Sequence, residues 1–316
     1  MVKLMTIRQE NARFTNEHHA GYVFVFAGAT SGIGASTLER MATMVFDSTF
    51  YVIGRSRERF ASQKTHLETL NPTITIIFIQ AEFSLISDID AVSRQIITAE
   101  KKVDYLFMSP GIYPLNGAEF SKEGLEVCFA VSYYSRIRLV SNLLPLLRQS
   151  SNPRVLSVLS GGRETVVRED DIGLQHNWAS RAVISHTITM TSLAFDHLSK
   201  NDTKIAFIHS FPGLVRTSIF AKHTAPEGSG LMWRIALAAQ QILFAFLMMT
   251  IGTSPAESGE MQAFILTADK FGPGVNLVSE KCEESTAPAA LARYRDDGWA
   301  ERIWEHTTGI FDKVTD

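Results

Sequence analysis

The fold is decided by residues 22–34, which read Tyr22-Val23-Phe24-Val25-Phe26-Ala27-Gly28-Ala29-Thr30-Ser31-Gly32-Ile33-Gly34. The first five residues are apolar and of strand-forming type, so they predict a buried strand over 22–26. The glycines then stand directly before a predicted helix over 33–46. In such a turn, glycines allow a tight bend, close approach of the backbone to a phosphate and close helix–strand packing. The free N–H groups of the helix start attract the pyrophosphate.

This stretch therefore predicts a dinucleotide site, with an ordinary tight strand–helix turn as the alternative. The residues expected to contact the cofactor here are Gly28, Ser31, Gly32, Ile33 and Gly34.

Strands and helices alternate along the rest of the chain. Continuous apolar runs predict further strands over 50–53, 74–79, 105–108, 155–159, 205–208 and 275–277. Helical stretches lie between them, including long helices over 122–147 and 178–198 and a mostly helical tail. Strands without polar alternation are covered on both faces, as in parallel sheets. The pattern predicts an α/β fold, a Rossmann-type doubly wound parallel sheet, in one domain over 21–316 after an N-terminal arm over 1–20.

Composition narrows the class of protein. The 316 residues carry a net charge of −3 and no long basic run, which argues against nucleic acid as a partner. The two cysteines, Cys128 and Cys282, are far apart, which favours a reducing compartment and offers no metal site. The first ten residues hold no long apolar stretch of the secretory type. We therefore expect a cytoplasmic protein.

Residues 216–254 interrupt the regular pattern after the sixth predicted strand. A long excursion at the carboxyl end of a strand usually covers a ligand crevice. Its segment 235–251 is almost wholly apolar, but it is short for a membrane span and carries Gln240 and Gln241. We therefore expect an apolar lid and a hydrophobic small-molecule substrate, while contact with a membrane surface stays open. The lid side chains are Leu231, Met232, Trp233, Phe244 and Phe246.

The tip of the second predicted strand indicates which cofactor binds. It reads Gly54-Arg55-Ser56-Arg57 and contains no acid. An acidic residue at this place holds the ribose hydroxyl of NAD, whereas a guanidinium accommodates the additional phosphate of NADP. Arg55, and after it Arg57, are therefore expected to bind NADP(H). The alternative is a solvated basic turn.

With these residues in place, the chain resembles the short-chain dehydrogenase/reductase family over nearly its whole length. The glycine spacing matches the family's turn, although Ala27 replaces its usual threonine. Residues 212–217 resemble the loop on the nicotinamide side, which implies that Pro212, Gly213 and Thr217 contact the cofactor, as does Gly111 after the fourth strand. Relatives in this family often form dimers or tetramers, so the resemblance leaves both a homo-oligomer and a monomer open.

Within the family, the chain is most similar to a branch common in filamentous fungi and often tied to secondary metabolism. The stretches that carry this similarity are Thr6-Ile7-Arg8, Tyr133-Tyr134-Ser135-Arg136, Leu143-Leu144-Pro145-Leu146-Leu147 and Gly298-Trp299-Ala300-Glu301.

The family's catalytic residues are largely replaced. Its serine aligns with Ser160, but its asparagine aligns with Ser132 and its tyrosine and lysine with Trp178 and Ala182. Trp178 cannot ionise near neutral pH, so we expect it to form a wall for the substrate. Ser160 is expected to orient a substrate oxygen. His186, one turn beyond Ala182, is a candidate proton donor, with a structural helix histidine as the alternative.

The sequence favours an NADP(H)-dependent oxidoreductase that acts on a hydrophobic small molecule in the biosynthesis of a secondary metabolite. The alternatives are a non-redox enzyme (cyclase, isomerase, epimerase or dehydratase) in a repurposed pocket, and an inactive cofactor-binding partner. The weaker candidates for the site are Tyr113, Tyr133 and His176, and Arg163-Glu164, which either face the substrate or pair with each other.

Overall fold

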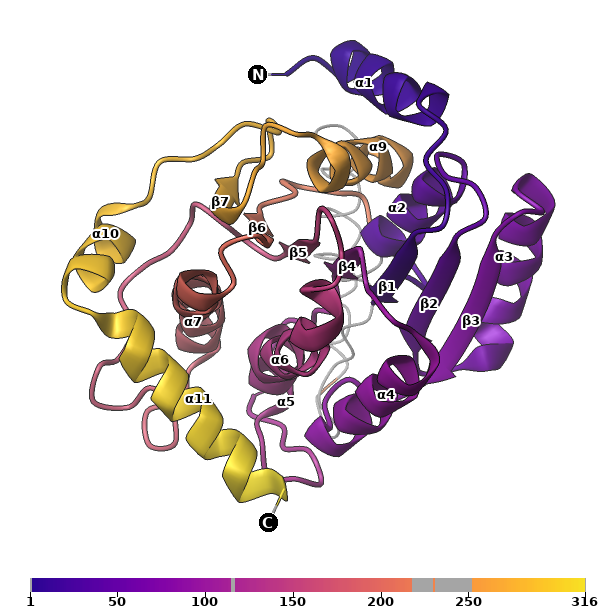
Figure 1. Cartoon of the computed structure of the whole chain (residues 1–316). Helices are drawn as coiled ribbons and strands as arrows, with labels where there is room; N and C mark the ends of the chain where they lie inside the picture. Colours follow the sequence, from indigo (N-terminus) through magenta and orange to yellow (C-terminus); the bar gives the residue numbers. More distant parts are fainter. Residues whose placement is uncertain (1, 115–116, 218–229, 231–251, 316) are drawn as a thin grey trace.

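The computed structural model describes residues 2–114, 117–217, 230 and 252–315. Within them, one sheet of seven parallel strands runs in the order β3-β2-β1-β4-β5-β6-β7, as Figure 1 shows. The order reverses between β1 and β4, where a ligand crevice is expected in such sheets. The predicted doubly wound fold is confirmed. The strands are β1 Val23–Ala27, β2 Thr49–Gly54, β3 Thr75–Gln80, β4 Tyr105–Met108, β5 Arg154–Val158, β6 Ala206–Ser210 and β7 Gly274–Val278.

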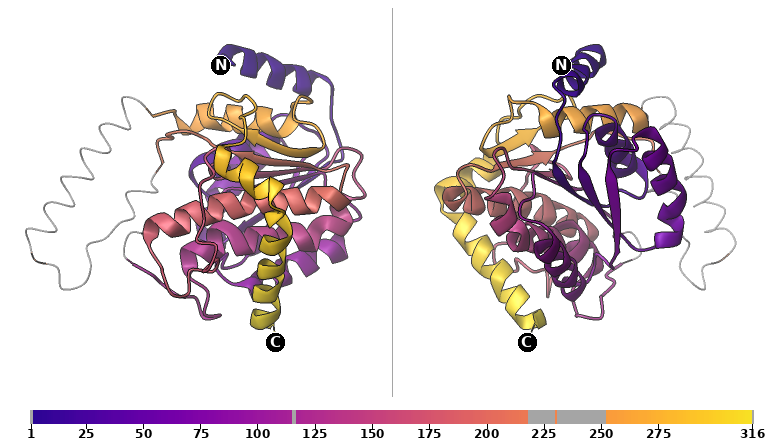
Figure 2. Two further views of the ribbon diagram at one scale, coloured as in Figure 1. Left: turned by 90° about the vertical axis from the view of Figure 1, so that its left-hand side faces the viewer. Right: turned by 45° about the vertical axis from the view of Figure 1, so that its right-hand side comes forward.

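Helices cover both faces of the sheet, and Figure 2 shows these layers from two further sides. One face packs against α2 (Gly32–Ala42), α3 (Arg57–Leu70) and α9 (Pro255–Thr267). The other packs against α4 (Ile86–Ala99), α6 (Ser135–Leu147) and α7 (Ser180–Asn201). The C-terminal helices α10 (Ala289–Asp296) and α11 (Trp299–Thr315) add an outer layer on α7.

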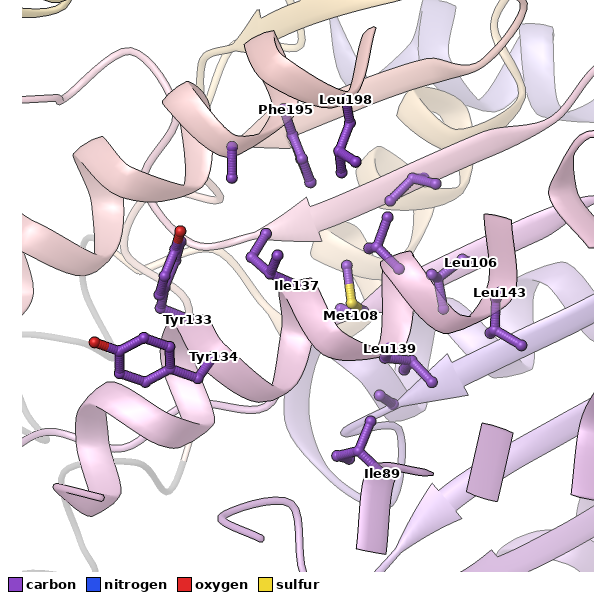
Figure 3. Packing of buried hydrophobic residues seen from close by; sticks show 14 of the residues in the cluster. Ile89, Leu106, Met108, Tyr133, Tyr134, Ile137, Leu139, Leu143, Phe195 and Leu198 are labelled. Atoms are coloured by element: carbon purple, nitrogen blue, oxygen red, sulfur yellow. The ribbon is translucent and has the colours of Figure 1, made fainter. Parts of the chain in front are cut away.

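The core beneath α6 shows how the second layer is held. Figure 3 shows Ile137 and Leu143 of this helix close to Leu106 and Met108 of β4. All four of these side chains are fully buried, at 0% exposure. Burial of one such side chain stabilises a fold by about 1.5–3 kcal/mol, so this layer is fixed firmly against the sheet.

The start of the long central helix differs from the prediction. It begins with α5 (Val127–Phe129) and the π-helix η1 (Ala130–Tyr134), not at residue 122. Residues 121–125 form a tight turn in which the N–H of Ser121 donates to the carbonyl of Leu125. The Glu126 side chain then caps the helix by accepting the N–H of Phe129 at 2.7 Å. The turn and the cap, neither of which has a strong apolar signal, set the boundary.

The N-terminal region contains a docked helix, α1 (Leu4–Asn16). Its Asn11 donates to the Glu260 carboxylate of α9 at 2.7 Å, and Arg40 of α2 donates to the same carboxylate at 2.9 Å. Ile7 is buried at 1% exposure. The segment predicted as an arm therefore packs on the body of the protein.

The segment predicted as a lid leaves and re-enters the described structure at one place. Val215 and Thr253 form a parallel bridge, in which Arg216 N–H donates to Thr253 at 3.0 Å and Thr253 N–H donates to Leu214 at 2.8 Å. The predicted lid side chains Leu231, Met232, Trp233, Phe244 and Phe246, and the apolar segment 235–251, lie outside the described residues.

Candidate active site

A cavity opens at the carboxyl edge of the sheet, where the order of the strands reverses. Its walls come from the turn after β1, the tips of β2 and β3, the loop after β4 and Thr217. Each of these wall segments follows a strand, because the carboxyl ends of parallel strands meet at one edge. The sequence-predicted residues that line it are Gly28, Ser31, Gly32, Ile33, Gly34, Arg55, Gly111 and Thr217.

The three glycines of the turn each have a geometric reason. Gly28 has φ +78°, and a Cβ there would lie 2.5 Å from the backbone nitrogen of Pro110. Gly32 has φ +58°, in the left-handed region that favours glycine. A Cβ at Gly34 would lie 2.4 Å from the carbonyl oxygen of Gly28. The turn is thus shaped so that bare backbone faces the cavity at the start of α2.

The two arginines at the tip of β2 lie differently. Arg55 is exposed and lines the cavity. Arg57 is the first residue of α3, and its guanidinium donates to the carbonyl of Phe78 at 3.2 Å and lies over the Phe78 ring. The structure therefore brings Arg55, and not Arg57, to the glycine turn. The cavity also contains Glu82, whose carboxylate accepts the hydroxyl of Ser84 at 3.2 Å.

The loop after β4 closes the inner wall. The Ser109 hydroxyl donates to the carbonyl of Gly28 at 3.2 Å, which fixes this loop to the glycine turn. Thr217 reaches the same turn, because its methyl would lie 3.2 Å from a Cβ at Gly32. The predicted contacts Pro212 and Gly213 follow β6 but are not among the residues that line the cavity; Gly213 has φ +72°.

Ser160 follows β5 on the same edge and rests on a buried polar network. Its N–H donates to Nε2 of His209 at 3.3 Å. Nδ1 of His209 lies 2.8 Å from the Ser192 hydroxyl, which donates to the Glu164 carboxylate at 2.6 Å. Since Nε2 accepts, Nδ1 carries the proton and donates to Ser192. The network holds one tautomer of the histidine.

Glu164 completes this support. Its carboxylate also accepts the N–H of Gly162 at 3.1 Å, so it fixes the turn that follows Ser160. Glu164 is 2% exposed, and His209 and Ser192 are fully buried. Burial raises the pKa of the Glu164 carboxyl, but hydrogen bonds and the nearby imidazole outweigh it and lower the pKa overall. A buried serine cannot serve as a nucleophile for an external substrate, so the network supports the Ser160 loop.

Residues 22–228 match the family model for short chain dehydrogenases, which is more than half of the chain. The chain belongs to the short-chain dehydrogenase family. Curated relatives match it over nearly their full length. Oxidoreductase AN1596 of Emericella nidulans is 34% identical over 99% of both chains. Oxidoreductase lepF of Aspergillus flavus is 30% identical over 100% of this chain and 98% of its own. This short-chain dehydrogenase is therefore similar to fungal oxidoreductases over its whole described fold.

Solved structures share the fold at low identity. L-Sorbose reductase from Gluconobacter frateurii, complexed with NADPH and L-sorbose, superposes with a TM-score of 0.59 and 17% identity. The match covers 82% of this chain and 94% of that chain. Among the described residues of this dehydrogenase, no helix is both long and apolar enough to cross a membrane.

Ser132 and Trp178, which are predicted to occupy the family's asparagine and tyrosine positions, are both at least partly buried. Ser132 is 2% exposed and lies within the π-helix η1. Trp178 precedes α7 and packs against the core. Its indole Nε1 is buried and has no hydrogen-bond partner of normal geometry among the described residues. It nevertheless lies close enough to Glu126 to lower the pKa of that carboxyl slightly, against the larger rise caused by burial.

His186 is not available as a proton donor. It is fully buried, and Nε2 accepts the N–H of Arg168 at 2.8 Å while Nδ1 lies 2.9 Å from the carbonyl of Ile172. Burial lowers the pKa of this imidazole, so it is neutral near pH 7. The structural reading of His186 therefore replaces the catalytic one, because both ring nitrogens are held by backbone.

Other candidates from the sequence are also engaged elsewhere. The Tyr133 hydroxyl is buried against Thr307 at 2.6 Å. Arg163 and Glu164 do not pair with each other: Arg163 lies 3.7 Å from Glu280, while Glu164 turns inward. His176 is exposed, and its N–H caps the Asp171 carboxylate at 3.1 Å. Tyr113 is 42% exposed beside the small cavity next to Cys128.

Sequence reasoning missed the polar residues behind the site. His209 stands inside the apolar run of β6, Ser192 inside α7, and Arg136 inside α6. The available signal was the polarity itself, because a histidine or arginine within an otherwise buried run must find partners.

Proposed function

We propose that this short-chain dehydrogenase is an NADP(H)-dependent oxidoreductase that acts on a hydrophobic small molecule, as a step in the biosynthesis of a secondary metabolite. The observation that carries the proposal is the cavity in which the glycine turn and Arg55 meet, with no acid at the tip of β2. The turn suits a pyrophosphate, and the guanidinium suits the additional phosphate of NADP.

The chain's own residues prepare a reduction around the cofactor. NADPH, when bound, supplies a hydride. The N–H groups at the start of α2 would hold the diphosphate, and the loop 109–111 would form the wall beside the nicotinamide end. Ser160, whose backbone N–H is held by His209, would donate a hydrogen bond to a substrate oxygen.

The apolar composition of residues 231–251 supports a hydrophobic substrate. Trp178, which is predicted to replace the family's tyrosine, would add a large aromatic surface for the substrate. The similarity to fungal oxidoreductases supports an oxidoreductase role, and the assignment to secondary metabolism rests on the sequence stretches that resemble the fungal branch of the family.

Cofactor binding and hydride transfer test this proposal separately. Titration with NADPH and with NADH is expected to show binding of NADPH at micromolar levels and at least tenfold weaker binding of NADH. NADPH deuterated at the transferable position, offered with a panel of hydrophobic ketones and aldehydes, is expected to transfer label to product. Absence of NADP(H) binding at millimolar levels would overturn the proposal.

A non-redox function is the second candidate. It is favoured by the catalytic corner, by which we mean Ser160, Trp178 and Ala182. Trp178 and Ala182 cannot transfer a proton, and His186 is held by backbone. Cyclisation, isomerisation, epimerisation or dehydration can proceed by shape and hydrogen bonding in such a pocket. Product that forms without label and without loss of NADPH would support this function. Tight cofactor binding without any product points instead to an inactive cofactor-binding protein.

A further inference from the structure

Arg136 is a buried cation directly behind the candidate site. It lies on α6 and is 1% exposed. Its Nη1 donates to the Ser157 hydroxyl at 2.7 Å and to the carbonyl of Val158 at 3.0 Å. Its Nη2 donates to the carbonyl of Pro110. One guanidinium therefore holds two different loop bases at once.

One of these bases belongs to the wall of the cavity, and the other leads to Ser160. Pro110 lies in the loop after β4, against Gly28, and precedes Gly111 in the cavity wall. Val158 is the last residue of β5, two residues before Ser160. The planar guanidinium of Arg136 therefore connects the loop after β4 to the loop that carries Ser160.

Core packing alone gives no reason for a charge here. Within the described part of the chain, no carboxylate forms an ion pair with Arg136, and its Nε has no partner. Burial lowers the pKa of this guanidinium to about 9, so it stays charged at neutral pH. Apolar residues at buried charged positions are often equally stable or more stable. The arginine is therefore explained by what its donors hold.

A second buried arginine at the other end of the same strand provides a built-in comparison. Arg154 begins β5 and is 2% exposed. It donates to the carbonyls of Ala268 and Phe271 at 2.7 and 3.1 Å, and lies 3.6 Å from the Asp269 carboxylate. These contacts tie the end of α9 to the amino edge of the sheet, away from the cavity.

We propose that Arg136 is a positioning residue that fixes the spacing between the Pro110 loop and the Ser160 loop, and thereby the placement of the nicotinamide end relative to the substrate oxygen. This inference rests on the proposed function. A lysine keeps the charge but cannot replace the fork, because its ammonium is a single point on a flexible stem. Arg136→Lys therefore separates the geometric role from the charge.

The test compares Arg136→Lys and Arg136→Met with Arg154→Lys and Arg154→Met. Loss of a buried hydrogen-bonded partner is destabilising, so all four variants are expected to have lower melting temperatures. Only the Arg136 variants are expected to bind NADPH about tenfold more weakly and to transfer deuteride at least about tenfold more slowly at saturating cofactor. If Arg136→Met does not fold, Arg136→Lys alone decides.

Amide hydrogen exchange gives a readout that does not depend on the cofactor. Faster exchange in residues 109–112 together with 159–162 is expected in Arg136→Lys and not in Arg154→Lys. If the wild type binds no NADP(H), the proposed function fails, while exchange still decides whether Arg136 couples the loops. The inference is overturned if Arg136 variants lose only thermal stability and keep wild-type exchange in both loops and, where the wild type binds NADPH, its affinity.

Discussion

The cofactor corner, formed by the glycine turn 28–34 and Arg55, and the catalytic corner lie at the same edge of the sheet. They differ in whether backbone or side chains form the site. At the cofactor corner, the working parts are backbone: a turn whose glycines leave no room for a Cβ, followed by the first N–H groups of α2. At the catalytic corner, the proposed working parts are side chains, and Trp178 and Ala182 are predicted to stand where the family has tyrosine and lysine. The supports behind it, His209 and Arg136, nevertheless each form a hydrogen bond to loop backbone.

This difference teaches that the scaffold of a site and its proton donor are separable. A backbone cradle is lost by a single added methyl group, because the atoms around it cannot move apart. A proton donor can be exchanged while the loops that framed it stay in place. The loop around Ser160 is therefore held in place by contacts that do not involve the residue at position 178.

The largest effect is expected from Gly34→Ala at the cofactor corner. The new Cβ would lie 2.4 Å from the carbonyl oxygen of Gly28, which belongs to backbone and cannot yield. Overpacking of this kind costs about 1–3 kcal/mol, and we expect NADPH affinity to fall about a hundredfold. Fluorescence titration measures it. Gly309→Ala in α11, away from the cavity, is the control, since nothing lies within 4 Å of a Cβ there; equal losses in both variants would contradict the prediction.

At the catalytic corner, Trp178→Tyr combined with Ala182→Lys is expected to raise reduction of simple ketones. A positioned acid typically contributes about 10²–10⁴ in rate, so a gain of about a hundredfold is expected if only the donor is missing. NADPH oxidation in the presence of each ketone measures it, with Ala182→Lys alone as the control. An unchanged rate in a folded double variant would show that the corner is remodelled beyond its proton donor.

A smaller effect separates the two arginines of the cofactor corner. Arg55→Ala is expected to weaken NADPH about tenfold and to leave NADH unchanged, because a charge-assisted hydrogen bond contributes about 1.5–3 kcal/mol. Arg57→Ala is expected to change neither affinity by more than twofold, since its guanidinium bonds to Phe78. Calorimetric titration with both nucleotides measures this. The opposite ranking would move the phosphate contact to Arg57.

The smallest effect at neutral pH is expected from His306, which instead affects the stability of the fold in acid. Nε2 of His306 lies 2.9 Å from the Tyr134 hydroxyl, and burial lowers the pKa of the imidazole from 6.5 to about 4. The unfolded chain then binds more protons within this window, so stability is lost as the pH falls from about 6.5 to about 4.

His306→Gln removes this proton uptake. The free energy of unfolding lost between pH 7 and pH 4 is expected to shrink by on the order of 3 kcal/mol, since each pKa unit corresponds to about 1.4 kcal/mol. Denaturant unfolding at several pH values measures it, and the two proteins are compared with their own values at pH 8. If the free energy of unfolding falls equally with pH in wild type and variant, His306 does not contribute to the acid sensitivity.

The contrast between the corners also explains what the sequence could predict. The glycine turn was predicted because all of its geometry lies within a few consecutive residues. The helix over 122–147 was predicted to begin too early, because the turn at Ser121 and the cap at Glu126 carry little apolar signal. Sequence placed Arg55 and Arg57 together, since it does not show toward which neighbour each guanidinium points.

The supports of the catalytic corner could not be predicted from the sequence. Ser160 and His209 are 49 residues apart, and Arg136 and Pro110 are 26 apart. Such partners meet only when the strands are ordered in the sheet. His186 shows the same limit. Its spacing from Ala182 suggests a catalytic role, but its ring nitrogens are bonded to the backbone of Arg168 and Ile172, which the sequence does not reveal.

The bridge between Val215 and Thr253 has a consequence for engineering. Because these two residues pair with each other, the two described ends of the intervening sequence are held side by side. Loop-closure entropy grows only slowly with length, so a shorter or longer graft is tolerated at such a base. We therefore expect that exchange of the sequence between them for the corresponding stretch of oxidoreductase AN1596 leaves the register of the sheet unchanged, and the same exchange tests whether this sequence sets the choice of substrate.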